Sequence, residues 1–132
     1  MMSYLLVAVG GALGTAARFG LSGLCANLLG RTFPWGTLII NVSGSLIIGF
    51  FATVTGTEGR WLVGPNGRNF FMTGICGGYT TFSSFSLQTL NLMQDEEWLY
   101  ASANVVLSVV LCLVAVWLGH LAGQWVTSLK GT

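Results

Sequence analysis

The residues best suited to handle an ion lie in one apolar segment between Gly74 and Ser86. The glycine pair Gly77-Gly78 stands in its middle and is followed by clustered hydroxyl side chains. Because glycine is unfavourable inside a helix, we expect this pair to break the helix. Non-helical backbone within a membrane is tolerated where it is buried in protein or lines a cavity, and it offers carbonyls to a cation and amides to an anion. The alternative is a glycine pair that only permits close packing of helices.

Phe82 and Phe85 follow the glycine pair and, being three residues apart, share one face of a helix. The usual interpretation of a phenylalanine pair in a membrane helix is that it faces lipid or the protein core. A second interpretation follows from the aromatic quadrupole, whose positive end lies at the ring edge. Edge-on phenyl rings could therefore line a path for a small, hard anion.

Polar side chains recur every four residues in two other apolar segments, so each set lies on one helical face. Hydrogen bonding between helices would explain one such stripe. Two stripes that face each other would form a track of neutral hydroxyl and amide groups, which can replace the hydration shell of an anion without trapping it. The stripes are Thr37, Asn41 and Ser45 in one segment and Tyr100, Asn104, Ser108 and Cys112 in the other.

Arg18 lies inside the first apolar segment. A cation at such a depth is costly, so its side chain needs a partner in protein or water, unless it reaches the membrane surface by snorkelling. No Asp or Glu lies inside any apolar segment. This pattern disfavours proton-coupled transport, which usually relies on a carboxylate within the membrane.

Several functional classes are disfavoured by the remaining polar and sulfur-containing residues. The formal net charge of +1 indicates no basic patch for nucleic acid. Cys25, Cys76 and Cys112 are scattered through apolar segments, which is typical of small packing residues and not of a disulfide framework or a metal site. His120 is the only histidine, and no second His, carboxylate or activated Ser accompanies it, so we predict that the chain is not an enzyme.

These residues must be positioned by membrane-spanning helices, because the composition is that of a bilayer protein. Of the 132 residues, 53% are hydrophobic and 7% are charged, whereas soluble domains carry about 25% charged residues. A helix needs roughly 20 apolar residues to cross the hydrocarbon core. We therefore predict an all-α integral membrane protein with a single transmembrane domain over residues 1–132. The four predicted spans are about 4–29, 35–55, 70–92 and 98–126.

Four spans place both chain ends on the same side of the membrane. That side would carry Arg60, Arg68 and Lys130, and the other side only Arg31, so the positive-inside rule weakly favours cytoplasmic termini. A bias this thin also permits insertion in both orientations. The sequence has no internal repeat of the kind that builds a mid-membrane site in larger transporters, so a pathway would need a second copy of the chain.

On the basis of these residues, the chain resembles the Fluc (CrcB-type) fluoride channel family over nearly its whole length. The resemblance implies an antiparallel, dual-topology homodimer with two fluoride pores and a third helix that is broken in mid-membrane. It also implies a structural sodium ion at the dimer interface, held by backbone carbonyls at the break, which matches Gly77 to Thr80. The matching runs are Gly10-Gly-Ala-Leu-Gly-Thr-Ala-Ala-Arg18, Gly36-Thr-Leu-Ile-Ile-Asn41 and Gly77-Gly-Tyr-Thr-Thr-Phe-Ser-Ser-Phe-Ser86.

The resemblance further implies a role for each residue that matches the family pattern. Phe82 and Phe85 correspond to the aromatic pair that lines the fluoride path, Asn41 to the pore amide, and Arg18 to an arginine near the vestibule. One departure is Gln88, where many members of the family have Glu. The other expected pore residues are the hydroxyls Ser83 and Ser84, the track Tyr100, Asn104 and Ser108, and Thr37 from the first stripe.

The leading hypothesis is a channel that lets cytoplasmic fluoride leave a bacterial cell across the inner membrane, passively and down its gradient. The first alternative is a small four-helix multidrug-type exporter, which the missing intramembrane carboxylate and the motif after Gly77 disfavour. The second alternative is a structural protein of membrane assembly. It would explain the packing glycines but not two polar stripes that converge on a broken helix.

Overall fold

Three helices of the computed structural model are long and apolar enough to cross a membrane: α1 (Met2–Leu29), α2 (Trp35–Val54) and α6 (Trp98–Ser128). The structure describes residues 1–129, all of whose regular elements are helices. Lys130, counted above among the basic residues, lies outside the described residues. Uninterrupted apolar runs explain these helices, since no proline or charged cluster falls inside them. The chain is therefore a helical, multi-pass membrane protein.

The remaining segment is built from several shorter elements. Helix α3 (Pro65–Arg68) begins with proline at its first turn, where the missing N–H costs nothing. The π-helix η1 (Asn69–Cys76) and α4 (Gly77–Tyr79) continue it without interruption. After two extended residues the chain forms α5 (Phe82–Gln94). The segment thus runs from Pro65 to Gln94, beyond the expected bounds of 70–92.

The expectation that the glycine pair breaks the helix was wrong, and of the run from Gly77 to Thr80 only Thr80 is extended. Gly77 is helical, with φ −65° and ψ −38°, and Gly78 lies within α4. The interruption falls instead at Thr80, with ψ 157°, and at Thr81, with φ −153° and ψ 117°. The reason is that Gly78 serves close packing: a Cβ there would lie 2.5 Å from the carbonyl oxygen of Gly11 in α1. The β-branched threonines, which favour extended backbone, carry the break.

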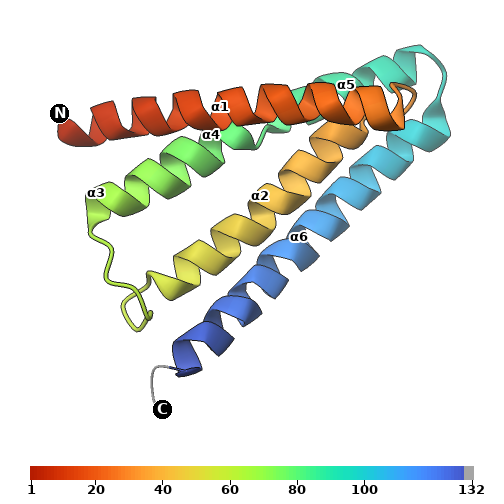
Figure 1. Ribbon diagram of the computed structural model, residues 1–132. Coiled ribbons are helices and arrows are strands. Elements are labelled where there is room, and N and C mark those ends of the chain that lie inside the picture. Colours follow the sequence, from red (N-terminus) through yellow and green to blue (C-terminus); the bar gives the residue numbers. More distant parts are fainter. Residues whose placement is uncertain (130–132) are drawn as a thin grey trace.

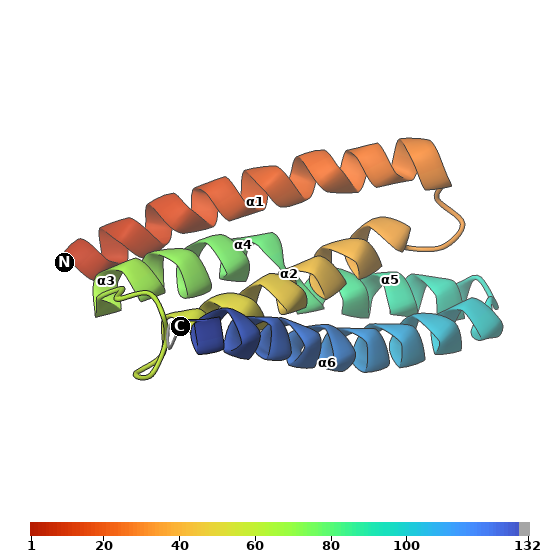
Figure 2. The same cartoon turned by 60° about the horizontal axis from the view of Figure 1, so that its bottom comes forward.

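The two halves of the broken segment pack against different neighbours. The half before the break contacts α1, whereas α5 contacts α6. Figure 2 shows this shift, with α4 lying beside α1 and α5 lying beside α6. Helix α2 runs alongside α6 (Figure 1), and Figure 2 shows the start of α1 and the end of α6 towards the same end of the bundle. The break therefore lies where α1, α2 and α6 can all reach it.

A single chain buries little of its apolar surface. Only 11% of the most apolar stretch of α1 is buried, against 33% for α2. Many leucine, valine and tryptophan side chains of α6 are exposed as well. Such exposure is expected where lipid or another protein surface covers the helices.

Candidate functional site

The break is held by two hydrogen bonds between one side chain of α2 and the backbone of Thr81. The side-chain nitrogen of Asn41 donates to the carbonyl of Thr81 at 3.0 Å, and the amide of Thr81 donates to Asn41 Oδ1 at 2.8 Å. In a continuing helix the Thr81 amide would instead donate to the Gly77 carbonyl. Asn41 therefore substitutes for the helical partners that the extended backbone has lost.

The hydroxyl of Thr81 begins the second half of the segment. As the N-cap of α5, Thr81 accepts a hydrogen bond at its Oγ1 from the amide of Ser84 at 3.2 Å. The hydroxyls of Ser83 and Ser84 also lie within 3.3 Å and 3.1 Å of Thr81 Oγ1. Both serines thus cluster around Thr81 at the break, and neither is among the residues that line the cavity described next.

The carbonyls that end the first half have unequal surroundings. The Gly78 carbonyl accepts hydrogen bonds from Arg18 Nε at 3.1 Å and from Thr15 Oγ1 at 3.4 Å. Within residues 1–129, the carbonyls of Gly77 and Thr80 have no such donor. The main-chain oxygens of Gly77 and Thr80, like that of Tyr79, are therefore not engaged by any donor within residues 1–129.

A cavity of about 460 Å³ lies against the break and opens between α2, α5 and α6. It brings together six of the residues expected at the site, although a single chain leaves it open on one side. Within residues 1–129, no charged side chain lines it; the donors around it are neutral hydroxyl and amide groups. The six expected residues that line it are Asn41, Gly77, Thr80, Phe82, Phe85 and Ser108.

The phenylalanine pair forms one wall of this cavity. The ring centroids of Phe82 and Phe85 lie 5.3 Å apart, with 50° between the ring planes. Phe85 is 9% exposed, whereas Phe82 is 77% exposed. Phe85 is thus fixed by packing, and Phe82 stands at the open side of the cavity.

The polar stripe of α6 is divided between the cavity and the protein interior. Ser108 lines the cavity and donates to Asn104 Oδ1 at 3.4 Å. Asn104 is only 1% exposed and donates to Thr89 Oγ1 at 2.9 Å. Thr89 in turn donates to the Phe85 carbonyl at 2.8 Å. These bonds join α6 to α5 and tie the cavity wall at Phe85 to the stripe.

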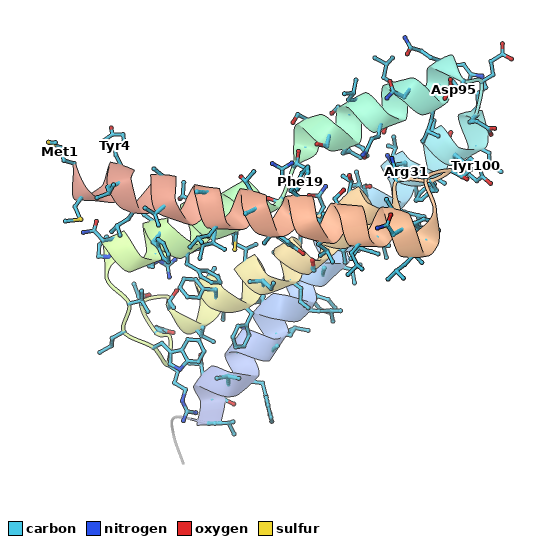
Figure 3. All side chains as sticks on the ribbon, turned by 45° about the horizontal axis from the view of Figure 1, so that its top comes forward. Met1, Tyr4, Phe19, Arg31, Asp95 and Tyr100 are labelled. Atoms are coloured by element: carbon cyan, nitrogen blue, oxygen red, sulfur yellow. The ribbon has the colours of Figure 1, made fainter. Side chains whose placement is uncertain are left out.

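Tyr100 and Thr37 lie apart from this cavity. Figure 3 shows Tyr100 at the end of the bundle where Arg31 and Asp95 also lie, and its ring centroid is 6.1 Å from that of Phe33. Thr37 is 6% exposed and lines a second cavity of about 430 Å³ at that end. Gln88 lines this second cavity too, with its buried Oε1 unpartnered among the described residues.

Sequence reasoning did not name Thr81 as a site residue, although it forms hydrogen bonds with Asn41, Ser83 and Ser84. A signal was present, because threonine followed three residues later by a polar residue at a helix start is a typical N-cap pattern. Arg18, expected near a vestibule, has its Nε at the Gly78 carbonyl. The sequence could show that Arg18 needs a partner but not which backbone atom supplies it.

Comparison with known proteins places the chain in a family. The family model described as "CrcB-like protein, Camphor Resistance (CrcB)" matches residues 5–120. A relative from Opitutus terrae is 65% identical over 132 residues, which is the full length of both chains. One from Rhodospirillum rubrum is 64% identical over 119 residues, 90% of this chain and 92% of the relative. One from Methylocella silvestris is 57% identical over 130 residues, 98% and 99% of the two chains. All three bear the name "Fluoride-specific ion channel FluC". The chain belongs to the CrcB-like family.

Proposed function

We propose that this protein is a fluoride-selective channel that lets fluoride leave the cytoplasm passively, down its electrochemical gradient. The observation that carries the proposal is the cavity at the broken helix, where neutral donors and a phenylalanine pair meet without a fixed charge. Neutral N–H and O–H groups can replace the water around an anion and still release it. The printed names of the relatives agree with fluoride as the ion.

The passive mode of transport is supported by the positions of the acidic residues. Glu58, Asp95, Glu96 and Glu97 all lie in the connections between helices. A proton-coupled exporter would need a carboxylate within the membrane. Fluoride enters acidified cells as the neutral acid and ionises inside, so a leak for the anion suffices to export it.

The broken segment from Pro65 to Gln94 provides the fourth membrane crossing in this proposal. It is interrupted at Thr80 and Thr81, and the side chain of Asn41 in α2 satisfies the freed backbone groups of Thr81, which helps the membrane to tolerate the interruption. Both termini then lie on one side of the bilayer, in keeping with Figure 2, where the start of α1 and the end of α6 lie towards the same end of the bundle.

The working unit in the proposal is an antiparallel homodimer with two pores, inserted in the inner membrane of a bacterium. A single chain leaves the cavity open and Phe82 77% exposed, so a second chain is the natural wall for the pathway. The largely uncovered apolar surface of α1, where a Cβ added at Gly20 or Gly23 would meet nothing within 4 Å, suits a close helix contact within the membrane. The thin bias of basic residues permits the two opposite orientations.

The proposal includes a structural sodium ion at the dimer interface. The carbonyls of Gly77 and Thr80 fit it, because main-chain oxygens without donors are suitable ligands for a hard cation. A bound sodium ion would supply positive charge that holds these oxygens together across the interface. Thermal unfolding of the dimer in sodium salts and in N-methylglucamine salts tests this. A higher unfolding temperature in sodium is expected, and equal temperatures would contradict the site.

The channel proposal is tested by efflux of fluoride and of chloride from liposomes, recorded with ion-selective electrodes against protein-free liposomes. Rapid fluoride release with chloride retained is expected. Phe82→Ile should slow the release if it folds as a dimer, whereas Phe71→Ile, whose ring stacks on Phe51 away from the cavity, serves as the matched control. No flux of either ion from folded protein would favour the exporter or the structural protein of membrane assembly.

A further inference from the structure

Three sulfur-bearing residues line the cavity at the break: Met72, Cys76 and Cys112. The first two belong to η1 and the third to α6. Sequence reasoning assigned all three cysteines of the chain to packing, but the fold brings two of them into one cavity. Both are free thiols, and no hydrogen bond within residues 1–129 engages either of them. Cys25, in contrast, is buried in α1 and does not line the cavity.

The sulfur-bearing residues gather in one part of the cavity, a helical turn away from the break. Cys76 precedes Thr80 by one turn, and its carbonyl accepts hydrogen bonds from the Thr80 amide and hydroxyl, both at 2.9 Å. Cys112 follows Ser108 by one turn of α6. Both steps lead towards the end of the bundle where α3 and the end of α6 lie (Figure 2). The cavity thus has hydroxyl and amide groups at the break and sulfur beside them.

The lining of the cavity selects a class of ligand. Within residues 1–129, no carboxylate lines it, so the ligands that Mg²⁺ and Ca²⁺ prefer are missing. No histidine of that range lines it, and no three His, Cys, Asp or Glu side chains gather there, whereas a structural zinc site takes four such ligands. Thiolate and thioether sulfur instead favour soft cations such as Cu⁺. Apolar neighbours, among them Ile48 and Leu113, disfavour a strongly hydrated ion.

The separation of η1 and α6 excludes a disulfide between the two cavity cysteines. No Cα atom of η1 lies within 8 Å of a Cα atom of α6. A disulfide requires Cα atoms about 4.4–6.8 Å apart. An ion between two sulfurs adds two bonds of about 2.3 Å each, so it can span a wider gap. The geometry therefore favours a bridging ion over an oxidised pair.

We propose that Met72, Cys76 and Cys112 form a binding site for a soft monovalent cation, Cu⁺ or Ag⁺, beside the fluoride path. One thiol gives its proton to water, and its sulfur bonds to the ion as a thiolate. The other thiol and the Met72 thioether donate lone pairs and lose no proton, so the occupied site carries no net charge. Loss of the second proton would bury a net negative charge, which is costly. Binding of one ion therefore releases one proton.

The effect of this ion on transport rests on the proposed function, whereas its binding does not. The ion would lie about one turn from Thr80 and Ser108, in the cavity that fluoride is proposed to enter. It would fill part of the space, and a fixed cation holds an anion instead of releasing it. Occupation of the site should therefore stop the flux of fluoride.

Binding is tested by calorimetric titration of the purified protein with silver nitrate in chloride-free buffers. The wild type and Cys25→Ala should share one tight site per chain, with one proton released, read from the dependence of the heat on the ionisation enthalpy of the buffer. Cys76→Ala and Cys112→Ala should each bind Ag⁺ at least about tenfold more weakly, since each lacks a ligand. Unchanged affinity in either cavity variant, or loss of the tight site in Cys25→Ala, would overturn the proposal.

A measurement on the wild-type chain decides the question if a cavity variant does not fold. The chain is labelled with ¹³C at the methionine methyl groups and followed by NMR during addition of silver nitrate. The Met72 methyl signal should shift with the first equivalent of Ag⁺. Met93 in α5 does not line the cavity, so its signal is the internal reference. No shift at Met72, or an equal shift at Met93, would contradict the site.

Fluoride efflux from liposomes in nitrate medium separates failure of this proposal from failure of the channel proposal. Silver nitrate should slow efflux through the wild type and through Cys25→Ala at equal concentrations. Cys112→Ala should need about tenfold more Ag⁺ for the same fractional loss of its own rate. Tight binding that leaves the efflux unchanged would refute the placement beside the path. Protein that binds Ag⁺ as described but never conducts fluoride would contradict the channel and leave the binding site intact.

Discussion

The side-chain Nε of Arg18 lies 3.1 Å from the carbonyl oxygen of Gly78, at the end of the helical run that precedes the break. The carbonyl end of a helix carries partial negative charge, so a guanidinium is favourable there. A cation within an apolar helix is thereby given a backbone partner. The contact engages the Gly78 carbonyl, whereas the carbonyls of Gly77, Tyr79 and Thr80 have no donor among the described residues.

Replacing Arg18 should loosen the first half of the broken segment. Arg18→Met removes the charged donor to the Gly78 carbonyl, and we expect a loss of about 1–3 kcal/mol in the free energy of unfolding. Arg31→Met is the matched control, because Arg31 lies in the exposed turn between α1 and α2. Thermal unfolding in detergent, followed by size-exclusion chromatography, compares the two variants. Equal unfolding temperatures would show that the contact with Gly78 contributes little.

The two adjacent glycines should respond differently to alanine. In Gly78→Ala the new Cβ would lie 2.5 Å from the Gly11 carbonyl oxygen, so the backbones of α1 and α4 must separate. In Gly77→Ala the nearest atom, the Met72 carbonyl oxygen, is 3.8 Å away. Overpacking of this kind costs about 1–3 kcal/mol, so Gly78→Ala should unfold at a clearly lower temperature than Gly77→Ala. The reverse order would contradict the packing described here.

The glycine pair illustrates how far sequence reasoning reached. Hydropathy predicted the long helices well, because an apolar run of sufficient length has few other solutions in a membrane. The same reasoning misplaced the break, because the intrinsic cost of glycine in a helix is small beside the packing that it permits against α1. Which neighbour a glycine faces is a tertiary property, and one sequence alone does not contain it.

Thr81 should tolerate serine and not valine. Thr81→Val removes the oxygen that caps the Ser84 amide, which costs about 1 kcal/mol, and should weaken the start of α5. Thr81→Ser keeps that oxygen and should restore both stability and fluoride flux. Chemical unfolding and liposome efflux on the same preparations check both points. If the valine variant is as stable and as active as the serine variant, the hydrogen bond from the Ser84 amide to Thr81 does not stabilise the start of α5 as described.

Two hydroxyls of the α6 stripe should differ in their effect on transport. Ser108 lines the cavity, whereas Tyr100 lies at the end of the bundle (Figure 3). We expect Ser108→Ala to reduce fluoride efflux about fivefold, because the hydroxyl that it removes donates to Asn104 Oδ1, and losing roughly 1 kcal/mol of hydrogen bonding would loosen the polar stripe at the cavity. Tyr100→Phe also removes one hydroxyl and should change the rate less. A larger loss in Tyr100→Phe would extend the pathway along the whole stripe.

The two polar stripes also show what a regular spacing in the sequence does not establish. A spacing of four residues correctly places side chains on one helical face. It does not show that this face meets one environment along its length. In α6, Ser108 reaches the cavity while Asn104 is committed to Thr89 in the interior. Thr89 belongs to α5, which contacts α6 only after the break, and the break itself is held by Asn41 of α2.

The most direct test of the channel proposal is the electrical current of the purified protein in a planar lipid bilayer, with unequal fluoride and equal chloride and pH on the two sides. A passive, fluoride-selective channel predicts a sustained current whose reversal potential lies near the equilibrium potential of fluoride. The reversal potential should stay there when a chloride or proton gradient is added. A reversal potential that follows chloride or protons, or folded protein that carries no current, would contradict it.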